Sequence, residues 1–163
     1  MLVYRIAGSK HIKELSGEGA RLHGGRWNHR GTAIIYTSAS RSLATVELLV
    51  HVSLSFAPTD LKMATIEIPD EPAPEEVDVA ALPPNWRGFP APPELADLGT
   101  SWARSGRSLL LRVPSAVVGH EHNTLINPAH PHIARVVLAE VEDFPLDRRL
   151  ARPKRQRRKG EVH

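Results

Sequence analysis

Residues 24–47 read GGRWNHRGTAIIYTSASRSLATVE, a run that combines a glycine turn, an apolar stretch and the start of a helix. The paired glycines can adopt backbone conformations closed to other residues, and they let the backbone approach a ligand closely. Arg26 follows them directly. Residues 33–37 form a short apolar run with a β-branched pair, which predicts a buried strand that carries Tyr36. The turn and the strand therefore each present one polar side chain suited to binding.

The helix that follows carries an unusual acid. Ser38 or Ser40 is a suitable N-cap. At about 100° per residue, four apolar side chains fall on one stripe of this helix: Leu43, Val46, Val50 and Leu54. Glu47 lies inside that stripe, where a carboxylate is costly unless a charged or hydrogen-bonding group meets it. Two interpretations stay open: a structural ion pair with an arginine, or a pocket carboxylate near Arg26 and Tyr36.

Composition narrows the class of protein. The chain has 163 residues, of which 41% are hydrophobic and 24% charged, and these values are typical of one globular domain. It has no cysteine, which excludes disulfides, thiol nucleophiles and thiolate metal sites. The N-terminus lacks the pattern of a secretion signal, and no apolar run approaches the ~18 residues of a membrane span. We therefore expect a cytoplasmic protein with no membrane contact.

The charge is distributed unevenly. The isoelectric point is about 9.6, but residues 148–163 hold eight of the 21 Lys and Arg residues and only one acid. That segment carries +7, and residues 1–147 carry −4. The basic end could contact nucleic acid or an acidic partner, or it could be a solvated extension.

The rest of the chain alternates short strands with irregular segments. Strands are predicted at residues 2–6, 61–68, 108–113 and 135–141, the last of them buried. Helices are predicted at residues 9–16, capped by Ser9, and at 92–105, ended by Gly106. Residues 123–131 are expected to form a polar turn segment. Five strands with few helices between them predict an α+β fold with mixed or antiparallel sheets.

Residues 69–93 differ in composition from the rest, since they hold eight of the 14 prolines. Proline fixes φ and removes a hydrogen-bond donor. We predict a mostly irregular surface excursion that Trp86 anchors onto the body, and no second domain.

Other constellations give weaker signals. There are two His-x-His pairs, His120 with His122 and His130 with His132, but neither has the carboxylate spacing of a metalloprotease. Ser115 stands where a strand ends, as either a binding group or a plain turn serine. It has no nucleophile elbow around it, which argues against a hydrolase triad. No Rossmann or Walker sequence occurs. We expect no metal.

Further motifs appear in a fixed order along the chain. They are Tyr4-Arg5, Gly17-Glu18-Gly19-Ala20, Trp86, Gly99 with Trp102, RSLLLRVPSAVV (107–118), NTLINPAHP (123–131) and LDRRL (146–150). Together with residues 24–47, this ordered set resembles the RES domain, the toxin half of Xre–RES toxin–antitoxin pairs. The resemblance implies a single RES domain over residues 1–150, with residues 151–163 as a basic, flexible tail. It also implies a fold like that of the ADP-ribosyltransferases, in which two sheets clasp NAD.

The same resemblance implies a reaction and a set of site residues. Members cleave the nicotinamide–ribose bond of NAD by hydrolysis or phosphorolysis, or they transfer ADP-ribose to a protein. The catalytic residues implied are Arg26, Tyr36 and Glu47, and the NAD-binding residues are Arg5, Arg26, Tyr36, Ser115 and Asn127. NAD is then the substrate, and no other cofactor is expected.

The resemblance also implies an Xre-family antitoxin as partner, which would block the pocket, and a homodimer stays open. Nucleic acid would be contacted only through the antitoxin, or weakly through the tail. Two rival functions remain: a toxin that binds or cleaves RNA with its basic tail, and a binding domain without catalysis. Salt-sensitive binding would indicate the first.

Overall fold

The computed structural model describes residues 1–52 and 57–150. Its strands are β1 (Leu2–Gly8), β2 (Ile35–Ser38), β3 (Leu61–Glu67), β4 (Glu75–Glu76), β5 (Leu110–Pro114), β6 (His122–Ile126) and β7 (Val137–Asp143). They form one seven-stranded sheet in the order β4-β5-β6-β2-β1-β3-β7. The pairs are antiparallel except for β4 with β5. The prediction of an α+β fold with mixed strand directions is confirmed.

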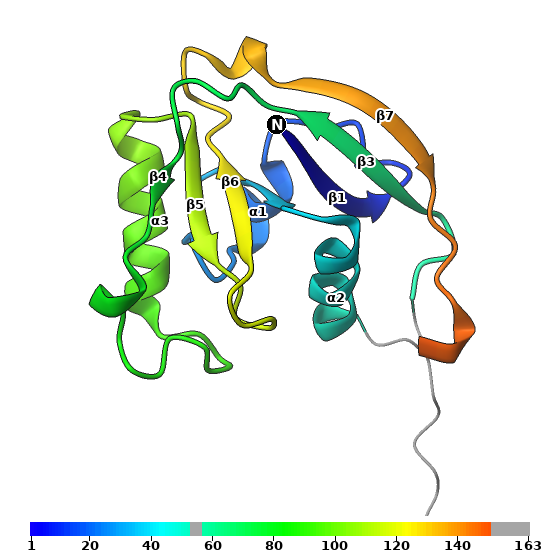
Figure 1. Cartoon of the computed structure of the whole chain (residues 1–163), viewed down its shortest axis with the longest axis horizontal. Helices are drawn as coiled ribbons and strands as arrows, with labels where there is room; N and C mark the ends of the chain where they lie inside the picture. The colour runs from blue at the N-terminus through cyan, green and yellow to red at the C-terminus, as the bar shows by residue number, and fades with distance from the viewer. Residues whose placement is uncertain (53–56, 151–163) are drawn as a thin grey trace, which may run out of the picture.

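The sheet is narrow at its middle. β1 and β2 share a single register pair, Tyr4 with Ser38, whereas β1 and β3 are paired along their whole lengths. The strands on the two sides of this junction diverge, as Figure 1 shows. The two sheets expected from the resemblance are thus two halves of one hydrogen-bonded sheet.

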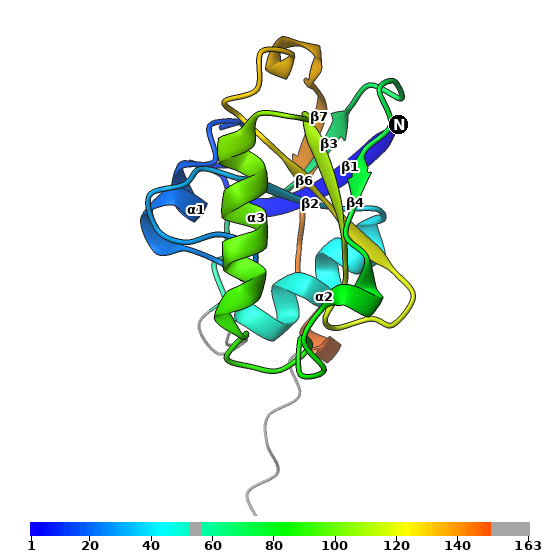
Figure 2. The same cartoon turned by 90° about the vertical axis from the view of Figure 1, so that its left-hand side faces the viewer.

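The described residues form three α-helices beside the sheet: α1 (Glu18–His23), α2 (Arg41–His51) and α3 (Pro93–Ser105). α3 covers one face of the half that holds β4, β5 and β6 (Figure 2). It begins with proline and ends at Gly106, whose φ of 61° is one that glycine adopts without strain. α2 lies below the junction of the two halves (Figure 1). The predicted helix at 92–105 is confirmed, and Ser40 is the N-cap of α2.

The buried side chains form two clusters. The first is aliphatic and draws on strands of both halves, β1 and β3 as well as β2, β5 and β6: Val3, Ile12, Ile35, Ala64, Ile66, Ile68, Leu109, Leu110, Ile126 and Val136. The second includes residues of α3, β5 and β6 and is built around two tryptophans: Trp27, Ile34, Leu95, Trp102, Ala103, Leu111, Val113 and Leu125. Trp86 packs against this second cluster, and residues 69–93 are mostly irregular, as predicted.

The predicted helix at residues 9–16 is wrong. The segment forms turns, with the amides of His11 and Ile12 donating to the carbonyl of Gly8. The Arg5 side chain donates to the carbonyls of His11 and Glu14, so these oxygens are satisfied without a helix. The chain instead forms α1 directly after Gly17, whose φ is 68°.

Two predictions about strands are also wrong. Residues 123–131 do not form a turn segment throughout, because β6 is a central strand paired with both β2 and β5. The last strand is not buried, since β7 is an edge strand on which Val137 is 50% exposed. The apolar stripe of α2 is incomplete as well: Leu43 is buried, but Val50 is 54% exposed.

Leu54 and the tail at 151–163 lie outside the described residues. Within the described part of the chain, no helix is long and apolar enough to cross a membrane.

Candidate functional site

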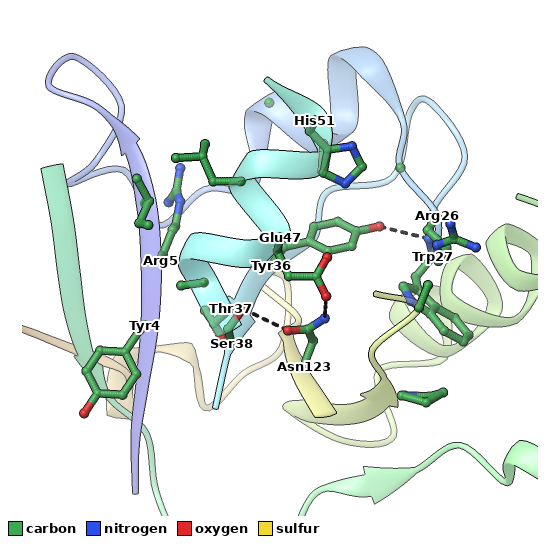
Figure 3. A pocket seen from close by; sticks show the side chains of 18 of the residues that line it. Tyr4, Arg5, Arg26, Trp27, Tyr36, Thr37, Ser38, Glu47, His51 and Asn123 are labelled. Carbon is green, nitrogen blue, oxygen red and sulfur yellow. Dashed lines mark hydrogen bonds between the residues drawn. The ribbon is translucent and has the colours of Figure 1, made fainter. Parts of the chain in front are cut away.

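A cavity of about 460 Å³ opens where the two halves of the sheet diverge, a volume in the range of small-molecule sites. It is lined by residues of β1, α1, the turn at 24–27, β2, α2, the end of β5 and β6 (Figure 3). Four of the six predicted site residues line it: Arg5, Arg26, Tyr36 and Glu47. Arg26, Tyr36 and Glu47 come from one stretch of sequence, on the turn, β2 and α2, and the fold brings Arg5 of β1 to the same cavity.

Glu47 is half-buried on α2, and neutral groups hold it. The Ser115 hydroxyl donates to Oε1 over 2.8 Å, and the Asn123 amide donates to the same oxygen over 2.7 Å. No lysine or arginine nitrogen of the described residues lies within salt-bridge distance of this carboxylate. Among the described residues Glu47 therefore forms no ion pair, and for these residues the interpretation of Glu47 as half of a structural ion pair is wrong.

Ser115 sits immediately after β5, and its side chain is buried at 2% exposure. Its hydroxyl oxygen accepts from the amides of Val117 and Val118 while its proton points to Glu47. Ser115 is not among the residues that line the cavity. Ser115 therefore helps to fix the position of Glu47 through this hydrogen bond.

The Tyr36 hydroxyl holds the turn at 24–28. It donates to Asn28 Oδ1 over 2.7 Å and accepts from the Trp27 amide over 3.1 Å. Asn28 is itself buried, and its amide donates to three carbonyls of the surrounding turns. Burial raises the pKa of Tyr36 well above its usual value, although the Trp27 amide and Arg26 oppose the rise. The ring faces the cavity (Figure 3).

The second glycine of the turn is needed for this arrangement. A Cβ at Gly25 would lie 2.7 Å from the Tyr36 hydroxyl oxygen and 3.0 Å from Asn28 Oδ1. The sequence predicted that the paired glycines let the backbone approach a ligand closely. In the structure, the backbone at Gly25 instead approaches the Tyr36 side chain. Gly24 supplies the positive φ, 71°, that starts the turn.

The two arginines are fixed on opposite sides of the cavity (Figure 3). Arg26 donates to the carbonyls of Trp86, over 2.7 Å, and Gly88, over 3.1 Å. Burial lowers the pKa of Arg26, and attraction to Glu47 and Tyr36 partly offsets this. Burial likewise lowers the pKa of Arg5, with Glu14 opposing. A guanidinium has five N–H donors, so each retains donors for an anionic ligand.

Asn127 lies away from the cavity lining. It is buried at 1% exposure, donates to the Ala103 carbonyl over 2.9 Å and accepts from the Ala129 amide over 3.0 Å. These contacts tie the end of β6 to α3, so we leave Asn127 out of the proposed site.

Asn123 and His51 are among the cavity-lining residues that sequence reasoning missed. Asn123 is the first residue of the motif at 123–131 and was hidden by the expectation of a turn there. His51 follows Glu47 by four residues, so the helical repeat places the two on the same face; that spacing was the signal for it.

The two His-x-His pairs do not build a metal centre in the described residues, which contain no group of three or more His, Cys, Asp or Glu placed to hold an ion. His130 and His132 contact each other edge to face, with ring centroids 5.2 Å apart.

The site thus places a carboxylate and two arginines around one cleft in the divergent sheet of an α+β domain. The chain belongs to the RES domain family, whose model matches residues 2–147.

Two relatives are each 40% identical. "Prs ADP-ribosylating toxin" of Sphingobium sp. aligns over 85% of this chain and 88% of its own length. "Toxin Res" of Yersinia enterocolitica aligns over 92% of this chain and 99% of its own length. A solved structure, the M. tuberculosis MbcT–MbcA toxin–antitoxin complex, has a chain similar in fold. Its TM-score is 0.70 at 20% identity, and the alignment covers 88% of this chain and 84% of that one.

Proposed function

We propose that this protein is a toxin that consumes NAD by cleaving the nicotinamide–ribose bond in the cleft between the two halves of its sheet. The observation that carries the proposal is the way the Glu47 carboxylate is held and where it lies. Two donors hold Oε1, and the carboxylate lines a cavity that also presents Arg5 and Arg26. Membership of the RES domain family and relatives named as toxins support it.

The proposed chemistry follows from the charges. The C1′–N bond breaks, nicotinamide leaves as a neutral ring with the electron pair, and the ribose acquires oxocarbenium character, as in glycoside cleavage. The carboxylate of Glu47 stabilises that positive charge. Arg26 and Arg5 are suited to the pyrophosphate through charge-assisted hydrogen bonds. The ring of Tyr36 offers an apolar wall for nicotinamide or ribose.

The acceptor of the ADP-ribose is the finer part of the proposal. Water or phosphate would add to C1′ and lose a proton, which gives a hydrolase or a phosphorylase. A protein side chain as acceptor is the second candidate, and the name of the Sphingobium relative favours it. An antitoxin partner is proposed because the similar fold was solved as a toxin–antitoxin complex; its assignment to the Xre family rests on the resemblance alone.

Expression in bacterial cells tests this function. Induction should stop growth and lower total NAD before growth stops, and the Glu47→Gln variant at equal abundance should do neither. Mass spectrometry of the cell's proteins would show ADP-ribose adducts if a protein is the acceptor. Growth arrest with unchanged NAD and no adducts would contradict the proposal and favour the RNA-directed alternative.

Tyr36→Phe should separate structure from catalysis. The variant leaves the Trp27 amide and Asn28 Oδ1 without a partner, so the free energy of unfolding should fall by about 1–3 kcal/mol. NAD turnover per folded molecule should fall by less than about tenfold, since the ring remains. Denaturant unfolding and steady-state kinetics measure the two. Unchanged stability with turnover lost as fully as in Glu47→Gln would make the hydroxyl a catalytic group.

Activity should survive a chelator. Carboxylate and guanidinium groups supply the charges that the proposed reaction needs, so no metal is called for. Purified protein dialysed against EDTA should cleave NAD at its original rate. Loss of activity that one added divalent ion restores would contradict this.

A further inference from the structure

The carboxylate of Glu47 is held asymmetrically. Both of its hydrogen-bond donors among the described residues, Ser115 Oγ and Asn123 Nδ2, reach the same oxygen, Oε1. No described residue donates to Oε2. Every buried side-chain oxygen and nitrogen of the described residues has a hydrogen-bond partner. Because Oε2 has no such partner, it is not buried, and it retains access to the cavity that Glu47 lines. One oxygen is therefore anchored and the other is free for a ligand.

Asn123 supplies one of these anchors and is oriented by a third residue. It lies on β6 opposite Ser38 of β2. The Ser38 hydroxyl donates to Asn123 Oδ1 over 2.8 Å, and Figure 3 shows Asn123 between Ser38 and Glu47. The reverse orientation of the amide would place Oδ1 against a carboxylate oxygen, two acceptors with no proton between them. The chain of contacts thus fixes which end of the amide meets Glu47.

We infer that Asn123 is a positioning residue: it holds the Glu47 carboxylate so that Oε2 points into the cleft at the reacting ribose. This rests on the proposed function. Asn123 is half-buried, and a hydrogen bond to a charged group contributes more than one between neutral groups. The alternatives are that Asn123 contacts the substrate itself or that it only stabilises the fold.

Double-mutant cycles distinguish these roles, because two residues that act through one contact are not additive. The proteins are wild type, Asn123→Ala, Glu47→Ala and the double variant. Asn123→Ala should lower kcat by about 10- to 100-fold, the effect of losing a hydrogen bond to a charge. KM should change less than about threefold, since binding before bond cleavage does not need the anchored carboxylate. In the Glu47→Ala background, Asn123→Ala should change kcat less than about twofold.

Two further variants sharpen the result. Asn123→Asp keeps the shape but turns an acceptor toward Oε1, so its kcat should be lower than that of Asn123→Ala. Asn85→Ala is the matched control. Asn85 is exposed and does not line the cavity, so kcat and KM should equal those of wild type.

Melting temperature gives a readout that does not depend on activity. The shift in Tm caused by Asn123→Ala should be larger in the wild-type background than in Glu47→Ala, where the carboxylate is already gone. Equal shifts in both backgrounds would overturn the inference, as would a raised KM with a kcat loss that persists without Glu47. Wild-type protein that leaves NAD intact would refute the proposed function, and the Tm cycle would still decide whether Asn123 holds Glu47.

Discussion

Glu47→Gln is expected to lower NAD turnover by roughly 10²-fold or more, the effect of removing one electrostatic contact at the transition state. The fold should be kept, because a glutamine oxygen can accept the same two hydrogen bonds that Ser115 and Asn123 donate to Oε1. The free energy of unfolding should stay equal or rise, since a half-buried carboxylate held for function is costly. NAD binding should weaken far less than turnover, because positive charge develops at C1′ only as the bond breaks.

Turnover, Tm and the Kd for NAD of this one variant test the assignment together. Glu140→Gln is a matched control, since Glu140 is exposed on β7 and does not line the cavity; all three quantities should match those of wild type. A Glu47→Gln protein that melts much earlier and turns over NAD normally per folded molecule would assign Glu47 to the fold.

Gly99→Ala should be strongly destabilising. Gly99 lies on α3 against the backbone of Trp27, and a Cβ there would overlap the Trp27 carbonyl oxygen. Backbone cannot move aside as a flexible side chain can, so we expect a loss of about 3 kcal/mol or more in the free energy of unfolding, at or above the upper end for overpacking. Activity should fall too, because Arg26 is the residue next to Trp27 and would move with it.

The control for this change is Gly19→Ala on α1, where an added Cβ meets nothing within 4 Å. Its stability should rise slightly, by about 0.4–1 kcal/mol, through a less flexible unfolded chain. Denaturant unfolding of both variants compares the two glycines directly. If Gly99→Ala were as stable as Gly19→Ala, the tight contact between α3 and the turn would be wrong.

Elements with strong local signals were predictable. α3 was bounded by a proline at its start and Gly106 at its end, because both residues favour those positions whatever the rest of the fold does. The start of α2 followed from Ser40, whose side chain accepts from the Leu43 amide. Arg26, Tyr36 and Glu47 stood within one continuous stretch, so they could be proposed together.

β6 was missed because its polar residues serve functions that patterning does not show. Asn123 faces the cleft, and Thr124 is buried with its carbonyl accepting from the Thr37 hydroxyl. β7 was misjudged for the opposite reason: its apolar letters predicted burial, but it is the last strand of the sheet and has no neighbour beyond it among the described residues. The position of a strand in a sheet is set by tertiary pairing.

The partners of Glu47 could not be found by spacing. Ser115 and Asn123 are separated from it by 68 and 76 residues, and only the pairing of β5 with β6 and of β6 with β2 brings both beside α2. The same holds for Arg26, whose side chain meets carbonyls of the proline-rich excursion 60 and 62 residues away. Glu47 could be proposed from the sequence. The hydrogen-bond donors that offset the free-energy cost of burying its carboxylate are brought to it only by the fold.

The most direct test of the account is the fate of NAD with the purified protein, followed by ¹H NMR or chromatography, in plain buffer and with added phosphate. We expect free nicotinamide to appear in equal amount to the NAD lost, with ADP-ribose or its phosphate as the second product, and about 100-fold slower release by Glu47→Gln. NAD that stays intact with wild-type protein, or that is cut at the pyrophosphate to give AMP, would contradict the account.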